Sequence, residues 1–268
     1  MPTTLQDIAD RTRETVDAAC AQRSLAELQS LVDACPPPRD FFGAVTGLDG
    51  QGAVNVIAEF KRQSPSGGAI RPNAEPGDIA RQYDNAGAVA ISCLTDGPYF
   101  GGSLADLATI REAVDLPLLR KDFMIDPYQV WEARIAGADA ILLIAELLSV
   151  EQIADMAALA GELGLTSLIE VHDLDNLHRI EPQLHGRRLL GVNNRNLRTM
   201  TTDLAHVEAM LDSLTDHMEI LVCESGIRTR DDIERLQQSG IHRFLIGETL
   251  LRADDPGQAL HELRAATG

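Results

Sequence analysis

Residues 139–170, DAILLIAELLSVEQIADMAALAGELGLTSLIE, contain the unit that decides the fold. Two short apolar runs, from Asp139 to Ile144 and from Thr166 to Glu170, flank a segment from Ser149 to Leu163 whose apolar residues recur with helical spacing. Strands buried on both faces have such continuous runs, and two parallel strands need a long crossover, usually a helix, between them. The stretch therefore predicts a strand, a crossover helix and a second, parallel strand.

The same alternation of apolar run and helical segment extends over the rest of the chain. Helical spacing recurs, for example, in Pro127 to Ile135 and in Thr229 to Gln238. Eight apolar runs are predicted as strands: residues 54–60, 88–93, 117–120, 139–144, 166–170, 189–193, 219–223 and 243–246. Glycines before several of these strands are predicted to be left-handed helix caps: Gly87, Gly137, Gly164 and Gly240. Eight parallel strands with right-handed crossovers favour a closed (β/α)8 TIM barrel over an open doubly wound sheet.

A helical pattern also precedes the first strand. It runs from about Leu5 to Ala34 and stops at Cys35-Pro36-Pro37-Pro38, because three prolines cannot continue a helix. We expect an extra N-terminal helix packed on the barrel. Residues 1–268 would then form a single TIM-barrel domain, with a helical extension at about 1–45 and the barrel at about 54–268.

The composition is that of a folded chain and argues against several classes of protein. Its 268 residues are 44% hydrophobic and 24% charged, which is enough for one sizeable core. The net charge of −18 argues against nucleic acid and anionic membranes as partners, although a small anion can still bind in a locally basic cleft. No secretion signal or membrane-spanning run is visible, and the four cysteines have neither zinc-site nor disulfide spacing. A reducing cytoplasm is the expected location.

Polar residues interrupt the ends of the predicted strands, where the chemistry of such a barrel takes place. The residues at these ends are Glu59, Lys61, Arg120, Lys121, Asp122, Glu170, Asn193, Asn194, Arg195, Glu224, Ser225 and Gly226. Both lysines of the chain, among its 23 basic residues, belong to this set. Unlike Arg, a Lys that is desolvated or near other cations can give up its proton. Lys121, in the positive field of Arg120, is therefore a candidate general acid.

Each of these residues taken alone also fits a structural ion pair. Glu59 and Lys61 share a strand face at a spacing of two and can simply neutralise each other. General acid–base catalysis, in which neighbouring charges move pKa values apart, explains the whole set better than separate ion pairs do. The residues of this catalytic set are Glu59, Lys61, Lys121, Glu170, Asn193 and Glu224.

The last two predicted strands end in glycine-containing turns, Glu224-Ser225-Gly226 and Ile246-Gly247-Glu248. Taken alone, these are as typical of simple turns as of a ligand site. Their backbone N–H groups, with a helix expected after Gly247, favour a phosphate site of the kind that recurs after strands seven and eight of this fold. Because a phosphate is negatively charged, the Glu248 carboxylate must point away from such a site. Ser64, in a loop after the first strand, is a further candidate ligand.

A metal site is not expected from the sequence. His172 and Asp173, which follow Glu170, are residue types that bind metal ions, but no further His or Cys completes a set of ligands with them.

Together these segments resemble the indole-3-glycerol phosphate synthase family, and the likeness covers nearly the full length. The stretches that carry it are Ile57 to Ser66, Leu94 to Asp96, Phe100 to Leu104, Leu119 to Phe123, Asp126 to Gln129, Glu170 to His172, Gly191 to Arg195 and Glu224 to Ile227. Gly67 stands where many members have Lys, and Thr249 where many have Ser. Gly67 argues against a phosphate role for a cation at that loop position, but neither departure removes a residue that the chemistry needs.

The resemblance implies a decarboxylating lyase of tryptophan biosynthesis, an aromatic amino-acid pathway, that needs no metal or organic cofactor. Its reaction is ring closure of 1-(2-carboxyphenylamino)-1-deoxyribulose 5-phosphate, with loss of carbon dioxide and water, to give indole-3-glycerol phosphate. By similarity Lys121 is the general acid, and Glu170 handles the later proton transfer with help from Lys61 or Glu59. Asn193 orients the sugar hydroxyls or the catalytic carboxylate. Association with other enzymes of the pathway stays open.

The remaining candidates are substrate-binding residues. By the same resemblance, Arg195 and Lys61 meet the substrate anions. Phe123 and Leu143 are candidate walls of an apolar slot for the aromatic ring, with core packing as the alternative for Leu143. The residues expected around the phosphosugar are Ser64, Glu224, Ser225, Gly226, Gly247 and Glu248.

Two rival hypotheses use the same barrel. An isomerase of phosphoribosylated anthranilate would share the phosphate site, but by family resemblance it needs a Cys and Asp acid–base pair where this chain has Glu59 and Asn193. A catalytically silent barrel that binds a phosphorylated ligand or a partner protein would be expected to lack Lys121 or Glu170, and both are present. The synthase is therefore the preferred hypothesis.

Overall fold

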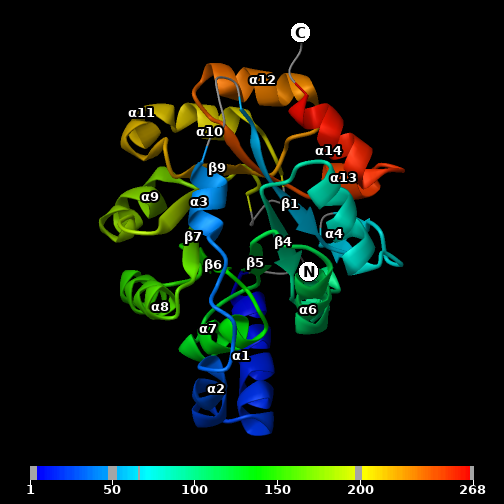
Figure 1. Cartoon of the computed structure of the whole chain (residues 1–268). Helices are drawn as coiled ribbons and strands as arrows, with labels where there is room; N and C mark the ends of the chain where they lie inside the picture. Colours follow the sequence, from blue (N-terminus) through cyan, green and yellow to red (C-terminus); the bar gives the residue numbers. More distant parts are fainter. Residues whose placement is uncertain (1–4, 48–52, 66, 197–200, 266–268) are drawn as a thin grey trace.

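Eight parallel strands form a closed barrel (Figure 1). The computed structural model describes residues 5–47, 53–65, 67–196 and 201–265. β1 pairs with β4 on one side and with β10 on the other, which closes the sheet. The barrel strands are β1 (Asn55–Phe60), β4 (Ala90–Leu94), β5 (Leu118–Lys121), β6 (Ala140–Ile144), β7 (Thr166–Val171), β8 (Arg188–Asn193), β9 (Leu221–Glu224) and β10 (Arg243–Ile246). The predicted TIM barrel is confirmed, and all eight strands end within two residues of their predicted bounds.

Helices surround the barrel as a ring in Figure 1; those up to α12 lie between successive barrel strands, and α13 and α14 follow the last strand. They are α4 (Pro76–Asn85), α6 (Leu104–Ala113), α7 (Pro127–Ile135), α8 (Val150–Glu162), α9 (Leu174–Ile180), α10 (Ala205–Ala209), α11 (Leu211–Leu214), α12 (Arg230–Gln238), α13 (Glu248–Arg252) and α14 (Pro256–Arg264). Shorter elements are the hairpin β2 (Gln63–Ser64) and β3 (Gly68–Ala69), α5 (Gly97–Phe100), η1 (Glu181–Gln183) and η2 (Thr215–His217). The four glycines predicted as left-handed caps have φ between 77° and 88°, as expected.

The N-terminal extension contains two helices before the prolines, where the sequence predicted one. These are α1 (Leu5–Gln22) and α2 (Leu25–Val32), which pack against α7 through Val16, Leu28 and Tyr128. The break has a local cause, because Ser24 caps α2 and forms a capping box with Glu27.

A third helix of the extension, α3 (Phe41–Thr46), closes the amino end of the barrel and lies in front of the strands in Figure 1. Phe41 and Val45 are fully buried against the inner residues of the barrel. The guanidinium of Arg243 donates to the carbonyl groups of Val45 and Thr46, and the amide of Asn55 also donates to that of Val45. These polar contacts satisfy the last turn of α3 where no further turn follows.

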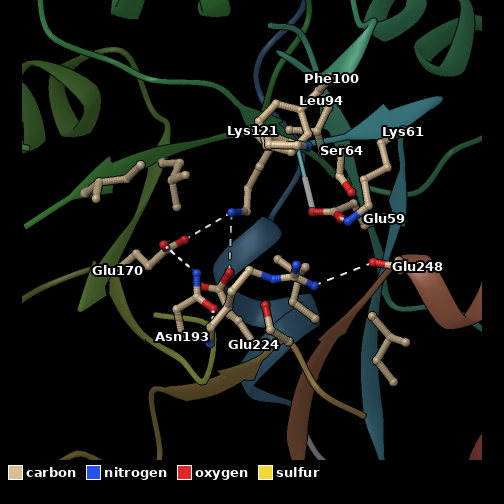
Figure 2. Close-up of a pocket in the computed structure, with 18 of the residues that line it drawn as sticks. Glu59, Lys61, Ser64, Leu94, Phe100, Lys121, Glu170, Asn193, Glu224 and Glu248 are labelled. Carbon is tan, nitrogen blue, oxygen red and sulfur yellow. Dashed lines mark hydrogen bonds and ion pairs between the residues drawn. The ribbon is translucent and has the colours of Figure 1, made fainter. Parts of the chain in front are cut away.

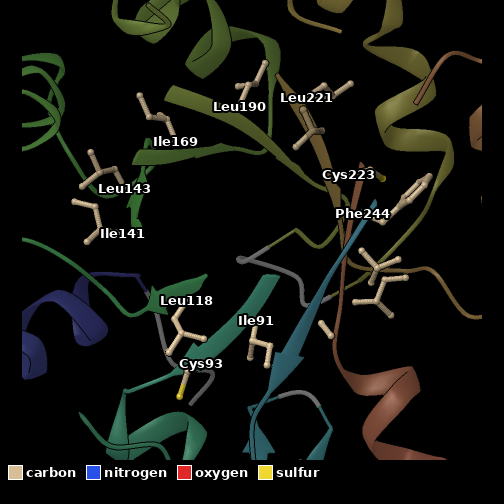
Figure 3. Packing of buried hydrophobic residues seen from close by; sticks show 14 of the residues in the cluster. Ile91, Cys93, Leu118, Ile141, Leu143, Ile169, Leu190, Leu221, Cys223 and Phe244 are labelled. Carbon is tan, nitrogen blue, oxygen red and sulfur yellow. The ribbon is translucent and has the colours of Figure 1, made fainter. Parts of the chain in front are cut away.

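Side chains of the strands alternate between two separate cores, as expected for a barrel buried on both faces. The inner core holds residues such as Ile57, Leu119 and Leu168. The outer core lies between strands and helices, and Figure 3 shows Ile141, Leu143 and Ile169 among its members. At the carboxyl ends of β1, β5, β7, β8 and β9 the inner residues are polar, and together with the apolar Ile144 of β6 they line the site.

Candidate active site

One pocket at the carboxyl ends of the strands brings together all thirteen residues predicted for the site. It is lined by Glu59, Lys61, Ser64, Lys121, Phe123, Glu170, Asn193, Arg195, Glu224, Ser225, Gly226, Gly247 and Glu248. Each comes from a strand end or from the loop that follows, so the parallel order of the barrel assembles residues that are up to 189 positions apart in the sequence.

Lys121 occupies the centre of the pocket and meets two carboxylates (Figure 2). Its Nζ lies 3.0 Å from Oε2 of Glu170 and 3.5 Å from Oε2 of Glu224. Although burial favours the neutral amine, the charges of Glu170, Glu224 and Glu59 raise the pKa of Lys121 well above its usual value. The sequence predicts the positive field of Arg120 at Lys121, but the neighbours of its amine are carboxylates, and these favour the protonated form.

Glu170 and Glu224 are two buried carboxylates with opposite pKa shifts. Against the effect of burial, Lys121 and the amide of Asn193 hold the pKa of Glu170 below its usual value. Burial, reinforced by the charge of Glu170, raises the pKa of Glu224 to about 8. Oε1 of Glu224 is buried without a hydrogen-bond partner among the described residues. The surroundings therefore push the two pKa values apart, favouring the ionised form of Glu170 and the protonated form of Glu224.

Asn193 fixes the orientation of Glu170. Its Nδ2 donates to Oε1 of Glu170 at 2.9 Å, and its Oδ1 accepts from the backbone N–H of Arg195 at 3.0 Å. Because both ends of the amide are engaged, the Glu170 carboxylate has one defined position beside Lys121.

Glu59 and Lys61 form a second ion pair across the pocket (Figure 2). A Cβ added at Gly247 would lie 2.5 Å from Oε1 of Glu59, so the glycine leaves the space that this carboxylate fills. Gly191 has the same relation to Glu224, because a Cβ there would overlap Oε1. Two glycines of the strand ends thus make room for two buried carboxylates.

The end of the pocket near β9 and β10 has the backbone predicted for an anion site. Ser225 and Gly226 both have left-handed φ angles, of 65° and 91°, and α13 begins at Glu248 after Gly247. The Glu248 carboxylate turns to two arginines, with Arg195 Nη2 at 3.5 Å and Arg252 Nε at 2.9 Å. These ion pairs, in spite of partial burial, lower the pKa of Glu248.

The loop after β1 is fastened to this end of the pocket. Ser64 Oγ accepts a hydrogen bond from the backbone N–H of Gly67, and Arg252 Nη2 donates to the Gly67 carbonyl group at 2.9 Å. The Arg252 guanidinium therefore places a positive charge beside Gly67, a residue that has no charged side chain of its own.

An apolar wall completes the pocket. The ring of Phe123 packs edge-on against Tyr99, with 6.4 Å between centroids, and also contacts Phe100. Leu142 and Ile144 of β6 line the pocket with it. Of the two expectations for Leu143, core packing is confirmed and the role as a wall is wrong, because Leu143 points into the outer core (Figure 3). The run AILLI is apolar on both faces of β6, so its pattern carries no information on which leucine faces inward.

The expectation for Arg120 is also wrong. It alternates with Lys121 and so points out of the barrel, where it pairs with Asp122 at 3.0 Å and Glu132 at 2.8 Å. Its charge is neutralised there and adds little to the field at Lys121.

Two further residues contribute to the site: Ile8, which sequence reasoning did not select, and Asn194, which it named at a strand end without assigning it a role. Ile8 of α1 lines the pocket, at 6% exposure, although it is more than 50 residues before the nearest catalytic candidate. No local pattern distinguishes it from the other apolar residues of α1. Asn194 lies behind the pocket wall, and only its place in the Asn193-Asn194-Arg195 run could have drawn attention to it.

The described residues contain neither a metal-binding cluster nor a membrane-spanning helix. No group of three or more His, Cys, Asp or Glu side chains is arranged to hold a metal ion in that part of the chain. Within the same residues, no helix is both long and apolar enough to cross a membrane.

A (β/α)8 barrel with a buried lysine between two carboxylates at its strand ends defines a TIM-barrel enzyme. The family model of indole-3-glycerol phosphate synthase matches residues 5–263. The protein of that name from Rhodopirellula baltica is 48% identical over 94% of this chain and 95% of its own length. The one from an Azoarcus species is 46% identical over 97% of this chain and 98% of its own. The chain therefore belongs to the indole-3-glycerol phosphate synthase family, which is a family of carboxy-lyases.

Solved structures with lower identity show the same fold. Thiamine phosphate pyrophosphorylase from Pyrococcus furiosus matches with a TM-score of 0.58 at 19% identity, over 80% of this chain and 95% of that one. The 3-hexulose-6-phosphate synthase from Salmonella typhimurium matches with a TM-score of 0.57 at 14% identity, over 78% and 96%. At these low identities the two structures show a shared fold and nothing about function.

Proposed function

We propose that the chain converts 1-(2-carboxyphenylamino)-1-deoxyribulose 5-phosphate into indole-3-glycerol phosphate, carbon dioxide and water by general acid–base catalysis. The observation that carries this proposal is the position of Lys121, protonated and held between Glu170 and Glu224 at the centre of a pocket with an apolar wall. The reaction needs an acid at a ketone oxygen, a base at a nearby carbon and a slot for an aromatic ring, and we assign these to Lys121, Glu170 and the wall around Phe123.

Carbon–carbon bond formation comes first. The ring carbon that bears the carboxylate attacks the ketone carbon, while the Lys121 ammonium transfers a proton to the ketone oxygen. Carboxylates that raise the pKa of Lys121 keep this proton in place until the substrate arrives. Loss of carbon dioxide then restores the aromatic ring and leaves a hydroxyl group on the new five-membered ring.

Dehydration follows. We assign to Glu170, whose lowered pKa keeps it ionised, the removal of a proton from the carbon next to the nitrogen. The ammonium of Lys61, paired with Glu59, gives a proton to the departing hydroxyl group. Over the whole reaction Lys121 and Lys61 each give one proton and Glu170 takes up one. The net proton that the protein supplies offsets the negative charge of the carboxylate that is lost as carbon dioxide.

Substrate binding uses the two ends of the pocket. The phosphate is bound by the backbone of Ser225, Gly226 and Gly247, with the positive end of α13 beside it. Ser64 and the Arg195–Glu248 pair border this end. The aromatic ring lies against Phe123, and we assign its carboxylate to the Lys61 ammonium, which lines the same pocket.

The test is a fluorescence assay with the chain alone. Purified protein is mixed with the carboxyphenylamino deoxyribulose phosphate in the presence of a metal chelator, and indole fluorescence is followed above the emission of Trp131. A rise in fluorescence supports the synthase reaction, its independence of metal and its independence of other pathway enzymes. No rise, with substrate binding still seen by calorimetry, would contradict the proposal and favour a silent barrel or a different phosphosugar.

A further inference from the structure

Asn194 is a buried amide that joins three segments behind the pocket. It is 2% exposed and follows the last residue of β8. Its Nδ2 donates to the carbonyl groups of Glu224 at 3.1 Å and Ser225 at 3.2 Å, and its Oδ1 accepts from the backbone N–H of Val207 in α10 at 3.1 Å. The side chain is thus a fixed link between the ends of β8 and β9 and the following helix.

The turn that Asn194 holds has an uncommon conformation. Ser225 is the only non-glycine residue with positive φ in the part of the chain that the structure describes, and Gly226 next to it has φ of 91°. A side chain at φ of 65° is disfavoured unless the surroundings enforce it, and such positions cluster at ligand sites. Both residues line the pocket.

The two neighbouring amides, Asn193 and Asn194, point to opposite sides. Asn193 faces the pocket and bonds to Glu170, whereas Asn194 contacts Cys223 Sγ and α10 on the outer side. Asn194 therefore touches no substrate, and any effect on the reaction must act through the backbone that it holds.

We propose that Asn194 is a positioning residue that keeps the Ser225–Gly226 backbone in its left-handed, phosphate-binding conformation. The proposal deepens the function proposed above and rests on it, because it assumes that the substrate phosphate binds at this turn. The Nδ2 donor of Asn194 is the essential group, because two carbonyl groups converge on it and both would repel an oxygen at that position.

The first experiment is Asn194→Asp, which keeps the size and the acceptor for Val207 but replaces the donor by a carboxylate oxygen. We expect KM for the substrate and the inhibition constant of inorganic phosphate to rise together by about tenfold or more, with kcat within about threefold of wild type. Asn194→Ala, which adds no charge, should act in the same direction and keeps the test usable if the Asp variant does not fold.

Asn176→Asp is the matched control, because Asn176 also donates through Nδ2, to Asp173, and lies in α9 outside the pocket lining. Its KM and phosphate inhibition should equal those of the wild type. If wild type shows turnover and phosphate inhibition, and Asn194→Asp lowers only the melting temperature or kcat, the inference about Asn194 fails. If wild type shows neither, the proposed function fails first.

A second experiment tests the backbone mechanism directly. Glycine adopts positive φ without penalty, so Ser225→Gly should reduce the need for an enforcing side chain. We expect Asn194→Asp to raise the phosphate inhibition constant by about tenfold in the wild-type background and by less than about threefold in the Ser225→Gly background. An equal loss in both backgrounds would overturn the proposal.

Discussion

The two ends of the barrel both contain buried charges, but they use them in opposite ways. At the amino end, Asp139 accepts hydrogen bonds from the backbone N–H groups of Arg39 and Leu118 and pairs with Arg111. At the carboxyl end, Lys121 faces carboxylates that repel one another, and one oxygen of Glu224 has no partner among the described residues. Charges with fixed partners hold the barrel closed, whereas charges that face an open pocket are available for chemistry.

Lys121→Ala tests this contrast with the largest expected effect. The variant loses the acid that protonates the ketone, so we expect turnover to fall by about 10³-fold or more while the chain still folds. Fluorescence assays and circular dichroism melting measure the two properties. Lys121→Arg should fail nearly as badly, because guanidinium keeps the charge but does not release a proton at neutral pH. A near wild-type rate in either variant would refute the acid assignment.

Asp139→Ala applies the opposite test at the amino end. It removes the ion-pair partner of Arg111 and the acceptor of two backbone N–H groups, that of Leu118 buried and that of Arg39 partly buried, and we expect a loss of about 4 kcal/mol in the free energy of unfolding. Urea unfolding gives this value. The folded fraction should keep the wild-type kcat/KM, so a variant of normal stability with impaired catalysis would contradict the division between the two ends.

Leu142 and Leu143 compare the two faces of one strand. Either leucine replaced by Ala should lower the free energy of unfolding by about 3 kcal/mol, because both are almost fully buried. Only Leu142→Ala should also raise KM for the substrate, since Leu142 lines the pocket and Leu143 lies in the outer core. Equal KM values for the two variants would place the aromatic slot elsewhere.

The smallest effect is the pH dependence of stability from Glu224. Its pKa in the folded chain is about 8, against 4.5 for the free group, so the folded state binds the proton more tightly than the unfolded state. The stability contribution of Glu224 is thus present below about pH 4.5 and is lost as the pH rises through 8. We expect Glu224→Gln to raise the melting temperature, relative to wild type, more at pH 9 than at pH 5. The reverse order would show that Glu224 is ionised in the empty pocket at neutral pH.

The sequence predicted the barrel and the site residues because both depend on local signals. Apolar runs of four to seven residues mark the strands, and a charged residue such as Glu170 marks the end of one. The sequence-based prediction failed where the outcome depends on which face of a strand a side chain occupies. Leu142 and Leu143 are equally apolar, and Arg120 and Lys121 equally basic, so only the twist and closure of the barrel decide which faces inward.

Other parts of the site depend on contacts that are distant in the sequence. Ile8 reaches the pocket only because α1 packs against the barrel, and the apolar pattern of α1 predicts burial without saying against what. The break at Ser24 could have been found, since Ser24 and Glu27 have the spacing of a capping box. The place of Asn194 at a strand end could be predicted, but its hydrogen bond to the Ser225 carbonyl group could not, because the two residues are 31 positions apart in the chain.

The position of the lysines has a practical consequence for labelling chemistry. The chain contains two lysines, and both are pocket residues whose side chains are 13% exposed. A reagent that modifies primary amines therefore has, apart from the amino terminus, no target outside the site. Reductive methylation followed by mass spectrometry would report directly on the accessibility of the pocket, and a bound phosphosugar would appear as protection of two peptides against an otherwise unreactive background.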